Sequence, residues 1–276
     1  MEELELSKLK DKAREVRKAV IEAIGSLGIG HIGGCMSIVE TLVILYHKFL
    51  RIDPADPRKP DRDKLVLSKG HAGPTLYAIL ADLGFFPKEW LATLNRGGSR
   101  LPSHCDMNLT PGVDMTTGSL GHGLSAGVGM AIGHRLDKLP GRIYVVIGDG
   151  ECNEGQVWEA AMAGSQFGLD NLIAFLDYNK MELDGCLEDV MDIADITSKW
   201  VSFNWAVQRI DGHDYRQLEK AILRAQAQRG KPSMIVLDTI KGKGCSFAEN
   251  RVESHHMVFD ITKAREAIAI LDREPR

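Results

Sequence analysis

The chain is poor in cysteine, and it lacks long apolar runs. Its cysteines are odd in number, and they form no CxxC pair: Cys35, Cys105, Cys152, Cys186 and Cys245. Free thiols in a reducing cytoplasm are the simplest account of this pattern, so we expect a cytoplasmic protein without disulfides. No segment approaches the roughly 20 apolar residues that a membrane-spanning helix needs, which argues against a membrane protein.

Excess basic charge, internal repeats and low-complexity linkers are also absent. The formal net charge of -4 argues against nucleic acid as the main partner. The amino terminus is charged and amphipathic, with apolar residues at helical spacing, which predicts a folded helix rather than a signal peptide. A chain of 276 residues that is 44% hydrophobic can bury a substantial core, so we expect one α/β domain over residues 1–276.

Strand and helix patterns alternate along the chain. Five short apolar runs predict buried strands: KLVLS, IYVVI, LIAFL, WAVQRI and SMIVLDTI. Helical patterns cover residues 38–47, 74–83, 121–137, 154–167 and 214–228. This alternation predicts an α/β fold, with a parallel sheet covered by helices on both faces. The long irregular stretches, residues 96–119 and 241–259, are interpreted as walls of an active site.

The motif Gly148-Asp149-Gly150 follows one of these strands, and Asn179 follows the next, thirty positions after Asp149. Strand ends of a parallel sheet meet at one edge, so Asp149 and Asn179 are expected side by side. Carboxylate, amide and main-chain oxygens suit Mg²⁺, with Ca²⁺ or Mn²⁺ as substitutes, and we assign the main-chain oxygen to Met181. The alternative is that Gly148-Asp149-Gly150 is only a turn.

Histidines form a second pattern. His31, His71, His104, His122 and His255 lie in or beside glycine-rich turns. A single histidine of this kind is more often a surface or capping residue. Several of them on separate loops predict convergence on one cleft, where imidazoles can donate to phosphate and hydroxyl oxygens.

Taken together, these motifs resemble those of a known family. The GDG…N pattern is similar to the thiamine diphosphate motif, and three further stretches resemble transketolase motifs in the family's order: Gly30-His31-Ile32-Gly33-Gly34, Leu67-Ser68-Lys69-Gly70-His71-Ala72 and Thr116-Thr117-Gly118-Ser119-Leu120-Gly121. Lys241-Gly242-Lys243-Gly244 extends the match over essentially the whole chain. The chain resembles the amino-terminal half of a transketolase, which implies a thiamine diphosphate-binding fold.

The resemblance also implies site residues. The cofactor would be held by His71, Gly118, Ser119, Leu120, Gly148, Asp149, Gly150, Glu151, Asn179 and His255. His31 and His104 match positions that contact sugar hydroxyls, so the catalytic set would be His31, His71, His104 and His255. The neighbouring His256 leaves the assignment of His255 open by one position. Glu154 matches a position near a subunit interface.

The reaction implied is transfer of a two-carbon ketol unit from a ketose to an aldose, with thiamine diphosphate and Mg²⁺. A full transketolase continues into a pyrimidine-binding domain that this sequence lacks. We therefore expect a split enzyme, in which a separately encoded carboxy-terminal subunit completes an α2β2 assembly and this chain alone is inactive.

Departures from the family pattern put the sugar substrate in doubt. Ile32 and Ser119 stand where many relatives have proline, and His122 stands where a glutamine is common. A pentose phosphate or an unusual, branched or sulfonated sugar all remain open as donors. Two alternatives are the α-type subunit of another thiamine enzyme, such as a 2-oxoacid dehydrogenase or a deoxyxylulose phosphate synthase relative, and a non-catalytic diphosphate-binding module.

Overall fold

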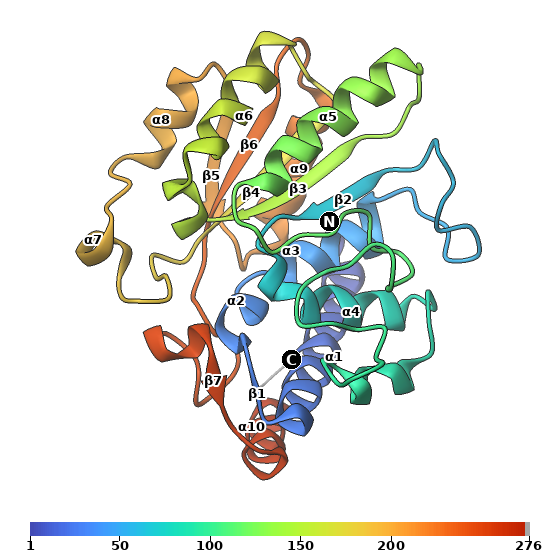
Figure 1. Cartoon of the computed structure of the whole chain (residues 1–276), viewed down its shortest axis with the longest axis vertical. Helices are drawn as coiled ribbons and strands as arrows, with labels where there is room; N and C mark the ends of the chain where they lie inside the picture. The colour runs from blue at the N-terminus through green and yellow to red at the C-terminus, as the bar shows by residue number, and fades with distance from the viewer. Residues whose placement is uncertain (274–276) are drawn as a thin grey trace.

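The computed structural model describes residues 1–273, and a five-stranded parallel sheet lies at its centre (Figure 1). The strand order is β2-β3-β4-β6-β5. The strands are β2 (Lys64–Leu67), β3 (Ile143–Gly148), β4 (Leu172–Tyr178), β5 (Ala206–Asp211) and β6 (Ser233–Asp238). All five predicted strands and the parallel arrangement are confirmed.

Both faces of the sheet are buried, which explains why its strands are almost continuously apolar. Successive residues of a strand point to opposite faces. In β3, Tyr144 and Val146 belong to one hydrophobic core, whereas Val145 and Ile147 belong to the other. The chain therefore has two cores, one on each side of the sheet.

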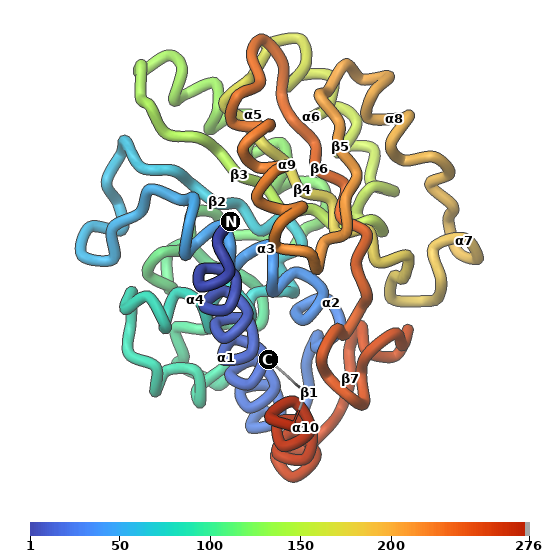
Figure 2. Tube along the Cα trace, turned by 180° about the vertical axis from the view of Figure 1, so that it is seen from behind, coloured from blue at the N-terminus to red at the C-terminus, as the bar shows by residue number. Residues whose placement is uncertain are grey.

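Helices cover these two faces as predicted. The elements are α1 (Glu3–Leu27), α2 (Ile32–Met36), α3 (Val39–Ile44), α4 (Gly73–Asp82), α5 (His122–Leu136), α6 (Gly155–Gln166), α7 (Leu187–Val190), α8 (Ile196–Ser202), α9 (Tyr215–Ala227) and α10 (Ile261–Arg273). Helices α5 and α6 lie in front of the sheet in Figure 1, and α9 lies in front of it in the reverse view of Figure 2. Helix α3 continues into one π-helical turn, Leu45–Phe49.

Helix α10 was not predicted. It buries Ala264, Ala267 and Leu271, and the two alanines belong to the core that α1 also lines. The two helices pack closely, because a Cβ atom added to Gly25 would lie 2.5 Å from Ala264 Cβ. A short antiparallel sheet also escaped prediction; it pairs β1 (Ile29–Gly30) with β7 (Met257–Val258) and so ties residues near His31 to those near His255.

A buried ion pair lies where the strands end. Asp177 at the end of β4 has no exposed surface, and it pairs with Lys69, which follows β2 and is only 2% exposed. Ser37 Oγ and Thr239 Oγ1 also donate to the Asp177 carboxylate, the former at 2.7 Å. The pair and its hydrogen bonds therefore join four chain segments at this edge of the sheet.

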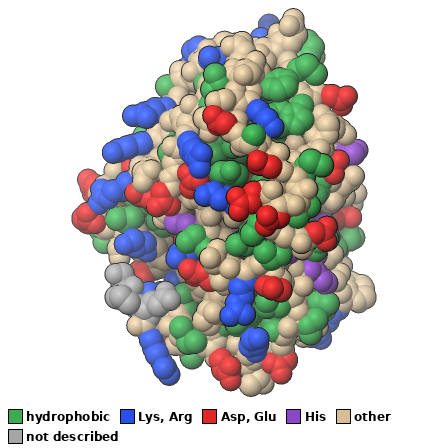
Figure 3. All heavy atoms as spheres, turned by 90° about the vertical axis from the view of Figure 1, so that its left-hand side faces the viewer, with side chains coloured by type: hydrophobic (Ala, Val, Ile, Leu, Met, Phe, Trp, Pro, Cys, Tyr) green, Lys and Arg blue, Asp and Glu red, His purple; other side chains and the backbone are tan. Residues whose placement is uncertain are grey.

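The surface carries both signs of charge. Figure 3 shows basic and acidic side chains interspersed over the face that it presents. Within residues 1–273, none of the helices has the length and apolarity to cross a lipid bilayer.

The contact between α5 and β3 generates a first prediction. A Cβ atom at Gly127 would lie 2.5 Å from Val145 Cγ2, whereas one at Gly129 would meet nothing within 4 Å. Gly127→Ala should therefore destabilise the chain by about 1–3 kcal/mol through overpacking. Gly129→Ala should stabilise it by up to about 1 kcal/mol through helix propensity. Urea unfolding of both variants measures the difference, and equal midpoints would contradict the packing argument.

The buried ion pair generates a second prediction. Asp177→Asn leaves the Lys69 ammonium buried without its counter-charge, so it should lower the free energy of unfolding by about 3–5 kcal/mol. Asp238 is the matched control, because it forms an ion pair with Arg209 at a neighbouring strand end and both side chains are about two-fifths exposed. Asp238→Asn should cost about 0–1 kcal/mol. Chemical denaturation of the chain without added ligand makes the comparison, and similar losses in the two variants would refute it.

Candidate functional site

Asp149 and Asn179 lie next to each other at the carboxyl edge of the sheet, because β3 and β4 are parallel neighbours. Asp149 is 2% exposed, and Asn179 is 8% exposed. The Asp149 carboxylate accepts hydrogen bonds from the Lys180 amide at 2.5 Å and the Gly150 amide at 2.9 Å. Both residues are thus held in a nearly closed turn rather than on an open surface.

The residues assigned to a metal, Asp149, Asn179 and Met181, lie at this turn, which we call the metal turn. Asn179 Oδ1 accepts from the Met181 amide at 3.1 Å, so the amide oxygen and the Met181 carbonyl are parts of one short segment. Burial, reinforced by the Asp177 carboxylate, raises the pKa of Asp149 to about 7. A cation would relieve this cost. Carboxylate, amide and main-chain oxygens are hard ligands, so the set fits Mg²⁺ chemically.

Asp177 fixes the orientation of the Asn179 side chain. Asn179 Nδ2 donates to Asp177 Oδ2 at 3.1 Å. The other end of the amide, Oδ1, is thereby turned away from Asp177. The buried ion pair of Asp177 with Lys69 therefore also orients a predicted metal ligand.

Four histidines surround His31. Its ring centroid lies 5.3 Å from that of His71, 5.5 Å from His104, 5.7 Å from His255 and 4.6 Å from His256. We call these five residues the histidine cluster. They come from four separate segments, because His255 and His256 are adjacent, and the predicted convergence of His31, His71, His104 and His255 is confirmed as geometry. Their chemical roles stay predictions.

Burial keeps His31 and His255 of the histidine cluster neutral at pH 7. Burial lowers the pKa of His31 to about 4, with further lowering by His256 and His104. Burial and then the Lys241 charge lower the pKa of His255 to about 3. A neutral imidazole offers one donor and one acceptor. His31 and His255 can therefore hydrogen-bond hydroxyl groups and anions without being charged themselves.

Lys241 joins the metal turn to the histidine cluster. Its side chain is 2% exposed, and its Nζ donates to the carbonyls of Met181 at 3.2 Å and Glu182 at 2.8 Å. The same nitrogen lies 3.2 Å from His255 Nδ1. Burial, and then the Lys69 charge, lower the pKa of Lys241 to about 8. A diphosphate placed here would supply the Lys241 ammonium with a negative counter-charge.

The loop before α5 forms another wall of the site. Gly118 has a φ of +144°, and an added Cβ would lie 3.1 Å from His104 Cδ2. Only glycine fits this conformation and this approach without strain. Ser119 and Leu120 follow it at the surface of the loop, so both remain accessible to a ligand.

Glu151 lies inside this wall. Its carboxylate accepts from Ser68 Oγ, from the Gly121 amide at 2.9 Å and from the Gly148 amide at 3.0 Å. Its predicted part in cofactor binding would therefore act through the turns that it holds. Glu154 is exposed at the N-cap position directly before α6, and its interface role is still a prediction.

His122 does not join the histidine cluster, contrary to expectation. It is exposed at the start of α5, and its Nδ1 lies 3.3 Å from the Leu120 carbonyl. The helix start leaves its side chain exposed, whereas Gly118 packs against His104. Sequence reasoning also overlooked Lys69, Asp177 and Lys241 as individual site residues. The lysines stand within the motifs SKGHA and KGKG, which were recognised only as a whole.

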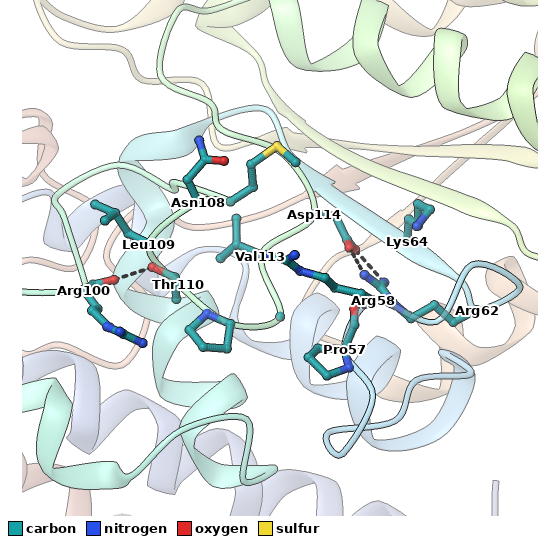
Figure 4. A pocket seen from close by; sticks show the side chains of 13 residues that line it. Pro57, Arg58, Arg62, Lys64, Arg100, Asn108, Leu109, Thr110, Val113 and Asp114 are labelled. Atoms are coloured by element: carbon teal, nitrogen blue, oxygen red, sulfur yellow. Dashed lines mark hydrogen bonds and ion pairs between the residues drawn. The ribbon is translucent and has the colours of Figure 1, made fainter.

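A cavity of about 610 Å³ lies between residues 57–64 and 107–114, and none of the clustered histidines lines it (Figure 4). Arg62 forms an ion pair with Asp114 there. Asp114 also accepts from the Leu65 amide at 2.8 Å. These bonds fasten to β2 the loop that carries His104 and Gly118.

Comparison with known proteins agrees with this geometry. The family model "Transketolase, thiamine diphosphate binding domain" matches residues 9–271. The chain is 53% identical over 266 residues to the 6-deoxy-6-sulfo-D-fructose transketolase subunit SqwG of Clostridium sp. (strain MSTE9), covering 96% of this chain and 97% of that one. It is 38% identical to an apulose-4-phosphate transketolase subunit of Phocaeicola vulgatus, covering 96% and 94%.

Among solved structures, transketolase from Leishmania mexicana superposes with a TM-score of 0.91 at 29% identity. The match covers 97% of this chain and 42% of that one, so this chain spans less than half of that transketolase. With a family model that covers nearly all of its residues and a site built at the ends of parallel strands, the chain belongs to the transketolase family as a thiamine diphosphate-binding domain.

Proposed function

We propose that this chain is the diphosphate-binding subunit of a two-subunit transketolase that transfers a two-carbon ketol unit from a ketose to an aldose. The observation that carries the proposal is the meeting of the metal turn, two buried lysines and the histidine cluster at one edge of the sheet. The two relatives of matching length are named as subunits of such enzymes.

The metal and diphosphate would be held by the turn after the central strands. Asp149, Asn179 and the Met181 carbonyl are the proposed Mg²⁺ ligands, and His71 and His255 are the proposed diphosphate contacts. When bound, thiamine diphosphate supplies a ring that stabilises a two-carbon carbanion. Asp177 and Lys241 support this site: Asp177 orients the Asn179 amide, and Lys241 contacts the Met181 carbonyl.

The histidine cluster would orient the sugar. His31 and His104 lie on separate loops with their rings 5.5 Å apart, so they can contact different hydroxyls of one donor. Neutral imidazoles there hydrogen-bond the hydroxyls and stabilise charge on the attacked carbonyl oxygen. Their burial also helps to exclude water from the reacting carbon.

The partner in this proposal is a carboxy-terminal transketolase subunit with a pyrimidine-binding domain, in an α2β2 assembly in the cytoplasm. Glu154 would lie at the interface, and its exposure at the start of α6 leaves it free to do so. For the donor, a sulfonated ketose is the first candidate, because the relative with 53% identity carries that name. A branched ketose phosphate is the second, from the apulose-4-phosphate relative.

Replacing the metal carboxylate tests the site. Asp149→Ala should weaken Mg²⁺-dependent binding of thiamine diphosphate at least about 100-fold, since even residues behind a metal ligand cost about 10–100-fold. Asp184→Ala is the control, because Asp184 is an exposed carboxylate on the adjoining turn. Isothermal titration with and without Mg²⁺ measures thiamine diphosphate binding by both variants. Unchanged binding by Asp149→Ala would show that this carboxylate is not a metal ligand.

The requirement for a partner is tested separately. Tagged chain captured from its own cells should carry a second subunit, thiamine diphosphate and Mg²⁺ in native mass spectrometry. The captured complex should transfer ketol units from a sulfonated or phosphorylated ketose, and the purified chain alone should not. Activity of the chain alone would disprove the split-enzyme proposal, whereas self-assembly without cofactor would favour a non-catalytic module.

A further inference from the structure

The backbone around Lys241 is held by side chains that lie outside the histidine cluster. Arg17 on α1, Glu40 on α3 and His213 in the loop between β5 and α9 form one hydrogen-bonded chain. We call these three residues the clamp. Its two ends contact the backbone on either side of Lys241, at Ile240 and at Lys243.

The hydrogen bonds of the clamp have a defined direction. The Ile240 amide donates to His213 Nε2 at 2.9 Å, so this nitrogen must be the acceptor of the ring. The proton of neutral His213 is therefore on Nδ1, which donates to Glu40 Oε2 at 3.0 Å. Glu40 is thus bonded to His213 on one side and to Arg17 on the other.

Arg17 contacts two groups at once. Its Nη2 lies 2.7 Å from Glu40 Oε1, while its Nε donates to the Lys243 carbonyl at 2.9 Å. Arg17 is 6% exposed and Glu40 is 7% exposed, so this ion pair is little screened by water. Although burial raises the pKa of Glu40, the Arg17 charge and the interactions with His213 together outweigh it and lower that pKa to about 2. The Glu40 carboxylate is therefore ionised at neutral pH and pairs with the Arg17 guanidinium.

Lys241 needs such support because its Nζ must be placed within reach of several partners at once. Its Nζ is shared among the carbonyls of Met181 and Glu182 and the ring of His255. A long side chain loses much rotamer freedom when it is held in this way. Fixing the backbone on both flanks reduces that cost, and it sets the point from which the side chain extends.

We propose that Arg17, Glu40 and His213 are positioning residues that hold the Ile240–Lys243 turn so that Lys241 is preorganised for the diphosphate and metal site. The inference rests on the proposed function. None of the three is placed in contact with substrate or cofactor, and they act through Lys241. Preorganisation of this kind raises affinity by lowering the cost of ordering the site.

The test measures binding of thiamine diphosphate with Mg²⁺ by isothermal titration, using the full chain in complex with its captured partner. His213→Ala removes the acceptor for the Ile240 amide and should weaken binding about tenfold. This loss lies within the usual range of interaction free energies between residues in contact. Arg17→Lys keeps the charge but loses the planar fork whose Nε and Nη2 reach the Lys243 carbonyl and Glu40 in different directions, so it should weaken binding similarly. His213→Gln keeps an acceptor and should restore most of the affinity.

A double-mutant cycle separates positioning from general stability. In a Lys241→Met background, adding His213→Ala should cost no further affinity, because the clamp then has nothing to position. His134→Ala is the matched control, since His134 is a buried histidine with one hydrogen bond, to the Gly141 carbonyl at 3.1 Å. It should leave binding unchanged in both backgrounds. Thermal unfolding without ligand confirms that each variant is folded.

Each result of these binding measurements either supports the clamp or overturns it. Weaker binding by His213→Ala and Arg17→Lys that disappears in the Lys241→Met background supports the clamp. The clamp is overturned if His213→Ala and Arg17→Lys are folded and bind thiamine diphosphate with wild-type affinity. It is also overturned if these substitutions cost as much affinity in the Lys241→Met background as in the wild-type background. If the wild-type complex binds no thiamine diphosphate, the proposed function itself fails and this inference falls with it.

Discussion

The site depends on one buried ion pair, Lys69 with Asp177. A fully buried carboxylate is costly unless charge and hydrogen bonds surround it, and Asp177 receives both from Lys69, Ser37, Thr239 and Asn179. These donors come from segments that follow different strands or precede α3. The pair therefore closes the carboxyl edge of the sheet, and the metal turn and the histidine loops are built upon it.

Charge balance explains the rest of the arrangement. Two lysines and five histidines gather on one side, while Asp149 and Asp177 lie at the strand ends. Burial lowers the pKa of His31 and raises the pKa of Asp149. Burying these groups without a ligand costs free energy. A metal would balance the carboxylates, and a diphosphate would balance the lysines. Functional sites commonly carry such a cost before they bind their ligand.

The long loops are fastened from outside the site. Arg62 and Asp114 tie the loop of His104 and Gly118 to β2, the small β1–β7 sheet ties His31 to the segment of His255, and the clamp holds the turn of Lys241. In each case the groups that fasten the loop, backbone in the β1–β7 sheet and side chains in the other two, are not those proposed to contact the ligand. Rigid support of this kind lets irregular backbone place four other imidazole rings within 5.7 Å of His31.

The sequence by itself determined the α/β class, the five strands and the motifs that contribute Asp149, Asn179 and the histidines, because these follow from local periodicity and glycine-rich turns. Only the tertiary structure decided which side chains meet. It turned His122 outward, brought His256 against His31, and joined Lys69 to Asp177 across 108 positions of sequence. Helix α10 and the clamp were also beyond sequence reasoning, since their partners are distant residues of α1 and α3. Periodicity reports the face that a residue occupies, whereas contacts across the fold depend on how all elements pack together.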